Sequence, residues 1–90
     1  MQRVHMIIHG IVQGVFFRAN AKNVAERLGL KGYARNMANG CVEVVAEGPE
    51  QKIKELIEFC KKGPRAARVD KVDVKFEKAS GEFEDFEVRH

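Results

Sequence analysis

Gly10–Arg18, with the sequence GIVQGVFFR, joins two segments of different periodicity. Before it, from Val4 to Gly10, apolar residues alternate with other residues, which is the pattern of a β-strand. After it, apolar residues recur at helical spacing as far as Leu28. A strand, a glycine-containing loop and a helix N-terminus in that order can bring backbone N–H groups together around an anion. The stretch therefore predicts both a strand-to-helix connection and an anion site.

The flanking chain supplies the remaining elements. A helix is predicted from Phe17 to Leu28, and a second one starts at Gly48-Pro49-Glu50, with proline at its first helical position, and ends at Lys61-Lys62-Gly63-Pro64. The pair Asn39-Gly40 predicts a type I′ hairpin turn. The alternating segments predict four further strands, at Lys31–Met37, Cys41–Glu47, Val69–Glu77 and Phe83–Val88.

The order β-α-β-β-α-β with an extra short strand indicates an α+β fold. We expect a ferredoxin-like split βαβ sandwich, with an antiparallel sheet and two helices on one face. The 90 residues predict a single domain, residues 1–90. In this fold the first two strands are parallel and the third lies between them, so their carboxyl ends share one edge of the sheet. Two strand positions span ~10 Å, and we therefore expect Arg18 and Asn36 to face each other.

These residue types favour chemistry on a phosphoryl group. Backbone N–H groups from Gln13 to Arg18 and the helix dipole favour a tetrahedral anion, and Gly14 lets the backbone approach it closely. Arg18 matches two phosphoryl oxygens, and its place in the first helical turn opposes the helix dipole unless an anion is present. Asn36 can hold a water molecule. No Walker lysine, paired-carboxylate metal site or nucleophile with a base is evident, which favours direct water attack without metal, cofactor or covalent intermediate.

The composition limits the kinds of partner that we expect the protein to bind. The net charge is +3, from 16 basic and 13 acidic residues, without the clustered basic stripe of a nucleic-acid binder. A binding module that holds RNA on an open sheet face stays an alternative, although the strand CVEVV lacks stacking aromatic residues. Cys41 and Cys60 are too few for a secreted disulfide scaffold, so we expect reduced packing thiols in a cytoplasmic protein. No signal peptide or membrane span is evident, and a monomer is expected.

The same stretch resembles the acylphosphatase signature G-x-V-Q-G-V-x-F-R, and Gly32–Asn36 resembles the second motif of that family. The resemblance covers essentially the whole chain. It departs from the common pattern at Ile11, where a basic residue is frequent, at Ala34, where Val is frequent, and at Asn39, where Asp is frequent.

The resemblance implies an enzyme that hydrolyses acyl phosphates to a carboxylate and inorganic phosphate. It assigns phosphoryl binding to Arg18 and orientation of the attacking water to Asn36. The phosphate-binding loop that it implies consists of Gln13, Gly14, Val15, Phe16, Phe17 and Arg18. Carbamoyl phosphate, the expected substrate of acylphosphatase-like domains in larger maturation proteins, is a narrower alternative that keeps the fold and the site.

Overall fold

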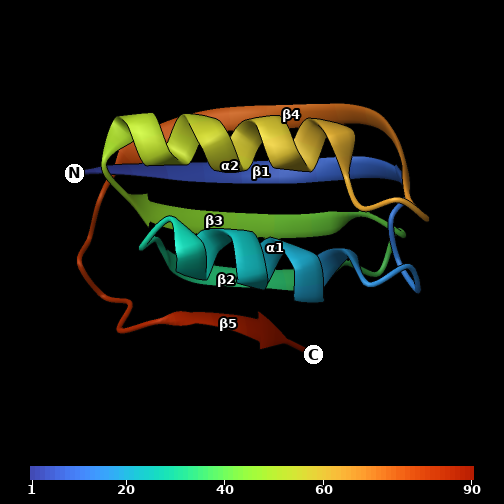
Figure 1. The fold of residues 1–90 in the computed structure, drawn as a ribbon, viewed down its shortest axis with the longest axis horizontal. Coiled ribbons are helices and arrows are strands. Elements are labelled where there is room, and N and C mark those ends of the chain that lie inside the picture. The colour runs from blue at the N-terminus through green and yellow to red at the C-terminus, as the bar shows by residue number, and fades with distance from the viewer.

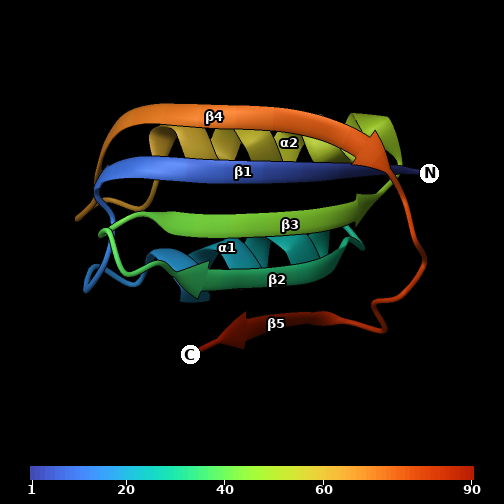
Figure 2. The ribbon, with the colours of Figure 1, turned by 180° about the vertical axis from the view of Figure 1, so that it is seen from behind.

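The computed structural model describes all residues, Met1–His90, in two layers (Figure 1). One sheet has the strand order β4-β1-β3-β2-β5, and every neighbouring pair is antiparallel except β2 and β5. Both helices cover one face, and the other face is open (Figure 2). This confirms the ferredoxin-like α+β prediction. The elements are β1 (Gln2–Ile11), α1 (Phe17–Arg27), β2 (Lys31–Asn36), β3 (Val42–Gly48), α2 (Glu50–Lys62), β4 (Arg68–Lys78) and β5 (Phe86–Arg89).

The core lies between the helices and the sheet. The alternation of side chains along β1 turns every second residue toward this core. The β1 residues on the helix side are fully buried, as are the inward residues of both helices. The rings of Phe17 and Phe59 join the two helices with centroids 5.9 Å apart. Because Phe17 is the first residue of α1 and is buried, the core holds the start of that helix, and Arg18 with it, in place.

Both cysteines are buried and free, as the sequence led us to expect of packing residues. Burial raises the pKa of the Cys60 thiol to about 12, so this residue behaves as a small apolar side chain. The Sγ atom of Cys41 lies 3.3 Å from Nδ1 of His9 on the open face of the sheet.

The open face carries two buried carboxylates that the sequence did not single out, on the central strand β3. Burial opposes the ionisation of Glu43, but hydrogen bonds from His5 and Arg35 outweigh it and lower its pKa. At Glu47, burial is likewise outweighed by hydrogen bonds from the loop that follows β4, and the pKa is lowered. The central strand is therefore buried on both faces, although it alternates between apolar and acidic residues along part of its length.

Two local predictions are wrong. Asn39 does not adopt the positive φ of a type I′ turn; Gly40 does, with φ 92°. The Gly40 N–H instead donates to the Met37 carbonyl, and Asn39 Oδ1 accepts a hydrogen bond from the Cys41 N–H at 3.1 Å, so the asparagine stabilises the turn through its side chain. Pro49 is the N-cap residue of α2 with extended backbone, and the helix begins one residue later, at Glu50.

Candidate active site

The predicted loop leaves the sheet where β1 passes close to β4. The pairing of these strands shifts register between His9 and Gly10. Gly10 has φ 133°, and a Cβ atom there would lie 2.1 Å from the Arg68 carbonyl oxygen. Only glycine allows this approach. The chain then turns through the buried Val12 and enters α1, so the path of the loop is determined at its first residue.

The loop backbone is left-handed at two places. Gly14 has φ 76° and Phe16 has φ 63°, and Phe16 is the only residue other than glycine with a positive φ. A left-handed residue with a side chain is strained by roughly 1–2 kcal/mol. Phe16 gains little from packing in return, because it is 78 % exposed. Backbone strain of this kind gathers at functional sites.

The start of α1 leaves backbone donors unused. Phe16 is its N-cap residue and provides no side-chain cap, and the first turn contains no acidic residue. The first backbone N–H that finds an acceptor is that of Asn20, which donates to the Phe16 carbonyl at 3.1 Å. The N–H groups of Phe17, Arg18 and Ala19 therefore remain available to an anion at the positive end of the helix.

The side chain of Gln13 anchors the loop to the turn between β2 and β3. Its Nε2 atom donates to the carbonyl oxygens of Met37 at 2.8 Å and Cys41 at 2.9 Å. These carbonyls belong to the turn between β2 and β3, which also follows Asn36. Sequence reasoning placed only the Gln13 backbone in the site and missed this anchoring role. No local signal could have shown it, because the acceptors are main-chain atoms 24 and 28 residues away.

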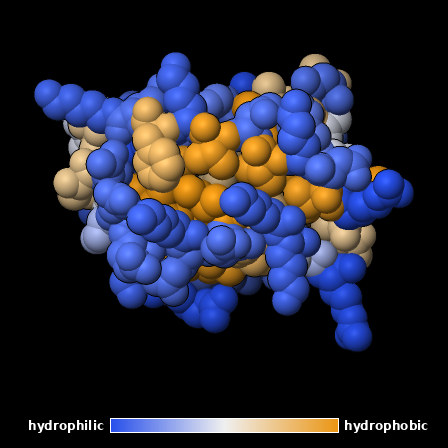
Figure 3. Space-filling model, turned by 90° about the horizontal axis from the view of Figure 1, so that it is seen from above, coloured by the Kyte–Doolittle hydropathy of each residue, from blue (hydrophilic) through white to orange (hydrophobic).

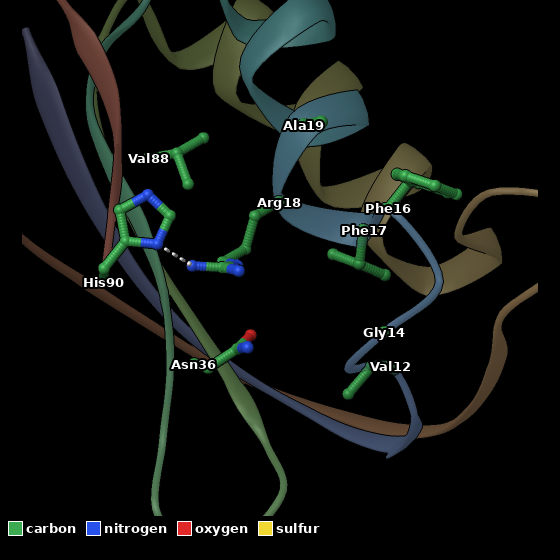
Figure 4. A pocket seen from close by; sticks show the side chains of 9 residues that line it. All are labelled: Val12, Gly14, Phe16, Phe17, Arg18, Ala19, Asn36, Val88 and His90. Atoms are coloured by element: carbon green, nitrogen blue, oxygen red, sulfur yellow. Dashed lines mark hydrogen bonds between the residues drawn. The ribbon is translucent and has the colours of Figure 1, made fainter.

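The structure brings Arg18 and Asn36 into one pocket of about 350 Å³ (Figure 4). Of the predicted loop residues, Gly14, Phe16 and Phe17 also line it, whereas Gln13 and Val15 do not. The close-up shows the Arg18 guanidinium between Asn36 and His90. The pocket is lined by Val12, Gly14, Phe16, Phe17, Arg18, Ala19, Asn36, Val88 and His90.

The C-terminal segment holds the arginine. Arg18 Nη1 donates to the Arg89 carbonyl oxygen at 2.8 Å and lies 3.4 Å from Nδ1 of His90. This is possible because β5 pairs in parallel with β2, which places Arg89 beside Arg35 at the carboxyl end of both strands. The sequence predicted the strand but not its neighbour, so it missed the contribution of Val88 and His90 to the pocket.

Asn36 presents an unsatisfied group. Its Oδ1 atom is buried and accepts no hydrogen bond from the protein. The carboxamide lines the pocket and points toward Arg18 in Figure 4. Buried polar atoms almost always have a partner, so this oxygen is suited to a donor that arrives with a ligand.

The side chains of the types that ligate metal ions do not gather at one place in the structure. The structure brings no group of three His, Cys, Asp or Glu side chains together that could hold a metal ion. The two histidines of β1 bond to single carboxylates instead: His5 to Glu43 at 2.7 Å and His9 to Asp73 at 2.8 Å.

Comparison with known proteins decides the family. The family model described as Acylphosphatase matches residues 4–88. The chain belongs to the acylphosphatase family. A similar relative is an acylphosphatase of Pyrobaculum arsenaticum, 47% identical over 89 residues, which cover 98% of this chain and 94% of that one. Membership of the family makes the chain a hydrolase that acts on acyl phosphates.

Solved structures of the family share the whole architecture. An acylphosphatase from Bacillus subtilis is similar with a TM-score of 0.96 and 30% sequence identity, covering 100% of both chains. One from Coxiella burnetii is similar with a TM-score of 0.91 and 38% identity, covering 98% of this chain and 92% of that one.

Neither helix of the present structure has the length and apolar composition that a membrane crossing requires.

Proposed function

We propose that the pocket hydrolyses acyl phosphates by direct attack of water on phosphorus, without metal or covalent intermediate. A bond forms between the water oxygen and phosphorus, and the bond from phosphorus to the acyl oxygen breaks. The carboxylate leaves with the bonding electrons, and the protons of the water remain with the inorganic phosphate and solvent. The observation that carries the proposal is the convergence of unused N–H donors, Arg18 and Asn36 in one pocket.

The first turn of α1 holds the phosphoryl group in this proposal. The free N–H groups of Phe17 and Ala19 and the helix dipole attract its oxygens. Arg18 uses only Nη1 in its contacts with the C-terminal segment. A guanidinium has five N–H donors, so Nε and Nη2 are left for the phosphoryl oxygens. The contact with the Arg89 carbonyl thereby orients the arginine while it binds substrate.

Asn36 orients the water in this proposal. A neutral carboxamide accepts a hydrogen bond from water but does not act as a strong base. Acyl phosphates have a good leaving group and react through a loose transition state, in which little proton removal is needed. The catalytic effect then comes from positioning and from preorganised donors, each of which is worth roughly 3–4 kcal/mol when it is aimed at developing charge.

Phosphate release from benzoyl phosphate in the presence of EDTA tests the proposal. We expect Asn36→Ala to lose most of its turnover while inhibition by phosphate is unchanged, and Arg18→Ala to lose both turnover and phosphate binding. Arg27→Ala, in the last turn of α1, is the matched control and should retain activity. Full activity of Arg18→Ala or Asn36→Ala, or no activity in folded wild type, would contradict the proposal. Carbamoyl phosphate as a second substrate tests the narrower alternative.

A further inference from the structure

The two edges of the sheet differ in their apolar contacts. The β4 edge, onto which Figure 3 looks, has hydrophobic side chains gathered in one patch, and its exposed members include Val74 and Phe76. At the opposite edge, β5 has four residues, of which only Phe86 is buried. Strands at a chain end fray unless they are tied down. The end of β5, which contacts Arg18, therefore depends on contacts of another kind.

The end of β5 also brings two like charges together. Arg89 of β5 lies beside Arg35 of β2 in the parallel pairing. Like charges at facing positions of neighbouring strands are destabilising. Arg35 is paired with the Glu43 carboxylate, whereas Arg89 bonds to Glu87 at 2.8 Å. Because Glu87 belongs to the same strand, this bond does not hold β5 to the rest of the sheet.

The contact that joins the Arg89 side chain to another strand is with an aromatic ring. Its guanidinium carbon lies 3.9 Å from the centroid of the Tyr33 ring in β2, which is the geometry of a cation–π contact. Tyr33 is itself held in place. Its hydroxyl donates to Glu43 at 3.2 Å, and its ring packs edge-on against Phe83 with centroids 5.9 Å apart. Burial, and then the Glu43 carboxylate, raise the pKa of Tyr33, so the phenol remains a donor at neutral pH.

Arg89 reaches the active site through its main chain. Its carbonyl oxygen accepts the hydrogen bond from Arg18 Nη1 at 2.8 Å. The other neighbour of Nη1 in the C-terminal segment is His90, which follows Arg89 directly. One residue thus has its side chain on the Tyr33 ring and its carbonyl on the arginine of the pocket. A displacement of Arg89 would move the acceptor that orients Arg18.

We propose that Tyr33 is a positioning residue for phosphoryl binding. Its ring holds the Arg89 side chain on the open face of the sheet, and the Arg89 carbonyl thereby keeps Arg18 in the orientation that binds the phosphoryl group. Tyr33 does not line the pocket, so it acts only through these neighbours. The inference rests on the proposed function, in which Arg18 binds the phosphoryl group.

A second route from Tyr33 to the pocket makes a different prediction. Tyr33 precedes Asn36 by three residues in the same strand, so its loss could instead displace the carboxamide. In the proposed function Asn36 orients water and does not bind phosphate. A disturbance of Asn36 would lower turnover and leave phosphate affinity unchanged, whereas a disturbance of Arg18 weakens phosphate binding. The affinity for inorganic phosphate therefore distinguishes the two routes.

Isothermal titration calorimetry with inorganic phosphate tests the proposal. We expect Tyr33→Leu to raise the dissociation constant about two- to fivefold, the factor that corresponds to one cation–π contact at a partly exposed site. Tyr33→Phe keeps the ring and loses only the hydroxyl, so its dissociation constant should stay within about twofold of the wild-type value. Calorimetry gives affinity and stoichiometry separately. Partial unfolding of a variant would lower the stoichiometry and leave the affinity of the folded molecules unchanged.

A double-mutant cycle isolates the contact between the two side chains. Arg89→Met removes the guanidinium but retains the main-chain carbonyl, so it should also weaken phosphate binding. The double variant Tyr33→Leu, Arg89→Met should bind phosphate no more weakly than the weaker of the two single variants, because each substitution removes the same contact. Phe83→Leu is the matched control. It removes an aromatic ring that packs on Tyr33 but does not contact Arg89, and it should bind phosphate like the wild type.

Four outcomes would overturn the proposal. These are wild-type phosphate affinity in Tyr33→Leu, a loss of affinity in Tyr33→Phe as large as in Tyr33→Leu, additive effects in the double variant, and an equal loss in Phe83→Leu. Calorimetry does not depend on turnover, so the result is separate from the test of the proposed function. Wild-type affinity in Arg18→Ala would contradict the proposed function. Weak binding by Arg18→Ala with wild-type binding by Tyr33→Leu would overturn the role of Tyr33 alone.

Discussion

Replacing Asn36 by alanine should stabilise the protein while it removes most of the activity. Oδ1 of Asn36 is buried and has no hydrogen-bond partner in the protein. A buried acceptor without a partner destabilises the folded state by about 1–3 kcal/mol. Alanine removes that acceptor but also gives up the packing of a half-buried side chain. We therefore expect a net gain near the lower end of the range, about 1 kcal/mol, which corresponds to a rise in Tm of about 4–8 °C for a domain of this size.

Asn39→Ala provides the matched control, three residues along the chain. Its Oδ1 atom accepts a hydrogen bond from the Cys41 N–H at 3.1 Å. A hydrogen bond of this kind contributes about 0.5–1.5 kcal/mol net, so this variant should be less stable than the wild type by about 1 kcal/mol. Asn39 is exposed and lies outside the pocket, so activity should be retained. The same substitution at two nearby positions is thus expected to change stability in opposite directions.

Urea unfolding followed by circular dichroism measures both effects. An unchanged m-value would show that the two variants differ from the wild type in stability and not in the extent of unfolding. A loss of 1 kcal/mol or more in Asn36→Ala would refute the reasoning. It would mean that the carboxamide has a partner within the protein, and the argument that its oxygen is held free for a water molecule would fail. Turnover of benzoyl phosphate by the same preparation gives the second readout.

Three further predictions concern the loop and the sheet. Gln13→Met keeps the side-chain length but removes both donors. It should lower the free energy of unfolding by about 1–2 kcal/mol, which urea titration measures. It should also weaken inhibition by phosphate, which kinetic titration measures. Phe16→Gly relieves about 1–2 kcal/mol of strain against roughly 0.5–1 kcal/mol of glycine entropy, so urea unfolding should show a small net stabilisation. Burial opposes the ionisation of Glu47, but donors from Ser80 and Gly81 outweigh it and lower the pKa. Its stabilisation is therefore complete above the unfolded pKa of ~4.3 and disappears as the pH falls through the lower folded value, and Glu47→Gln should flatten that part of the stability curve.

The periodicities were sufficient to predict the fold. Alternation in β1 and helical spacing after Phe17 reflect burial on one face, which the structure shows for Val4, Met6, Ala21 and Ala25. The same topology brings Arg18 and Asn36 into one pocket, and that needs only the strand order. Boundaries were less accurate. The final strand begins at Phe86, where its pairing with β2 begins, and not at Phe83. Phe83 lies before the strand, and its ring packs edge-on against Tyr33.

The missing parts of the site all depend on contacts between distant segments. Gln13 anchors the loop to main-chain carbonyls. Because every residue has such a carbonyl, the sequence does not show which residues accept the hydrogen bonds of Gln13. The contact of Arg18 with Arg89 depends on the pairing of β5 with β2. The residue pattern of a four-residue strand does not indicate which strand it will pair with. The sequence could therefore name two side chains that line the pocket, Arg18 and Asn36, but not the groups that position the loop and the arginine.

The pocket is also where the chain departs from the local rules that predicted the rest. The helix with the unused N–H groups lacks a side-chain cap, its N-cap residue is a left-handed and exposed phenylalanine, and an arginine stands at the positive end of the dipole. Beside them, Asn36 buries an oxygen without a partner. Each feature is unfavourable by itself. In the proposed function, a phosphoryl group would pair with the unused N–H groups and the arginine, and a water molecule would pair with the asparagine oxygen. Proteins that are consistent elsewhere concentrate such exceptions at functional sites, and four of them around one pocket are hard to explain as defects of packing.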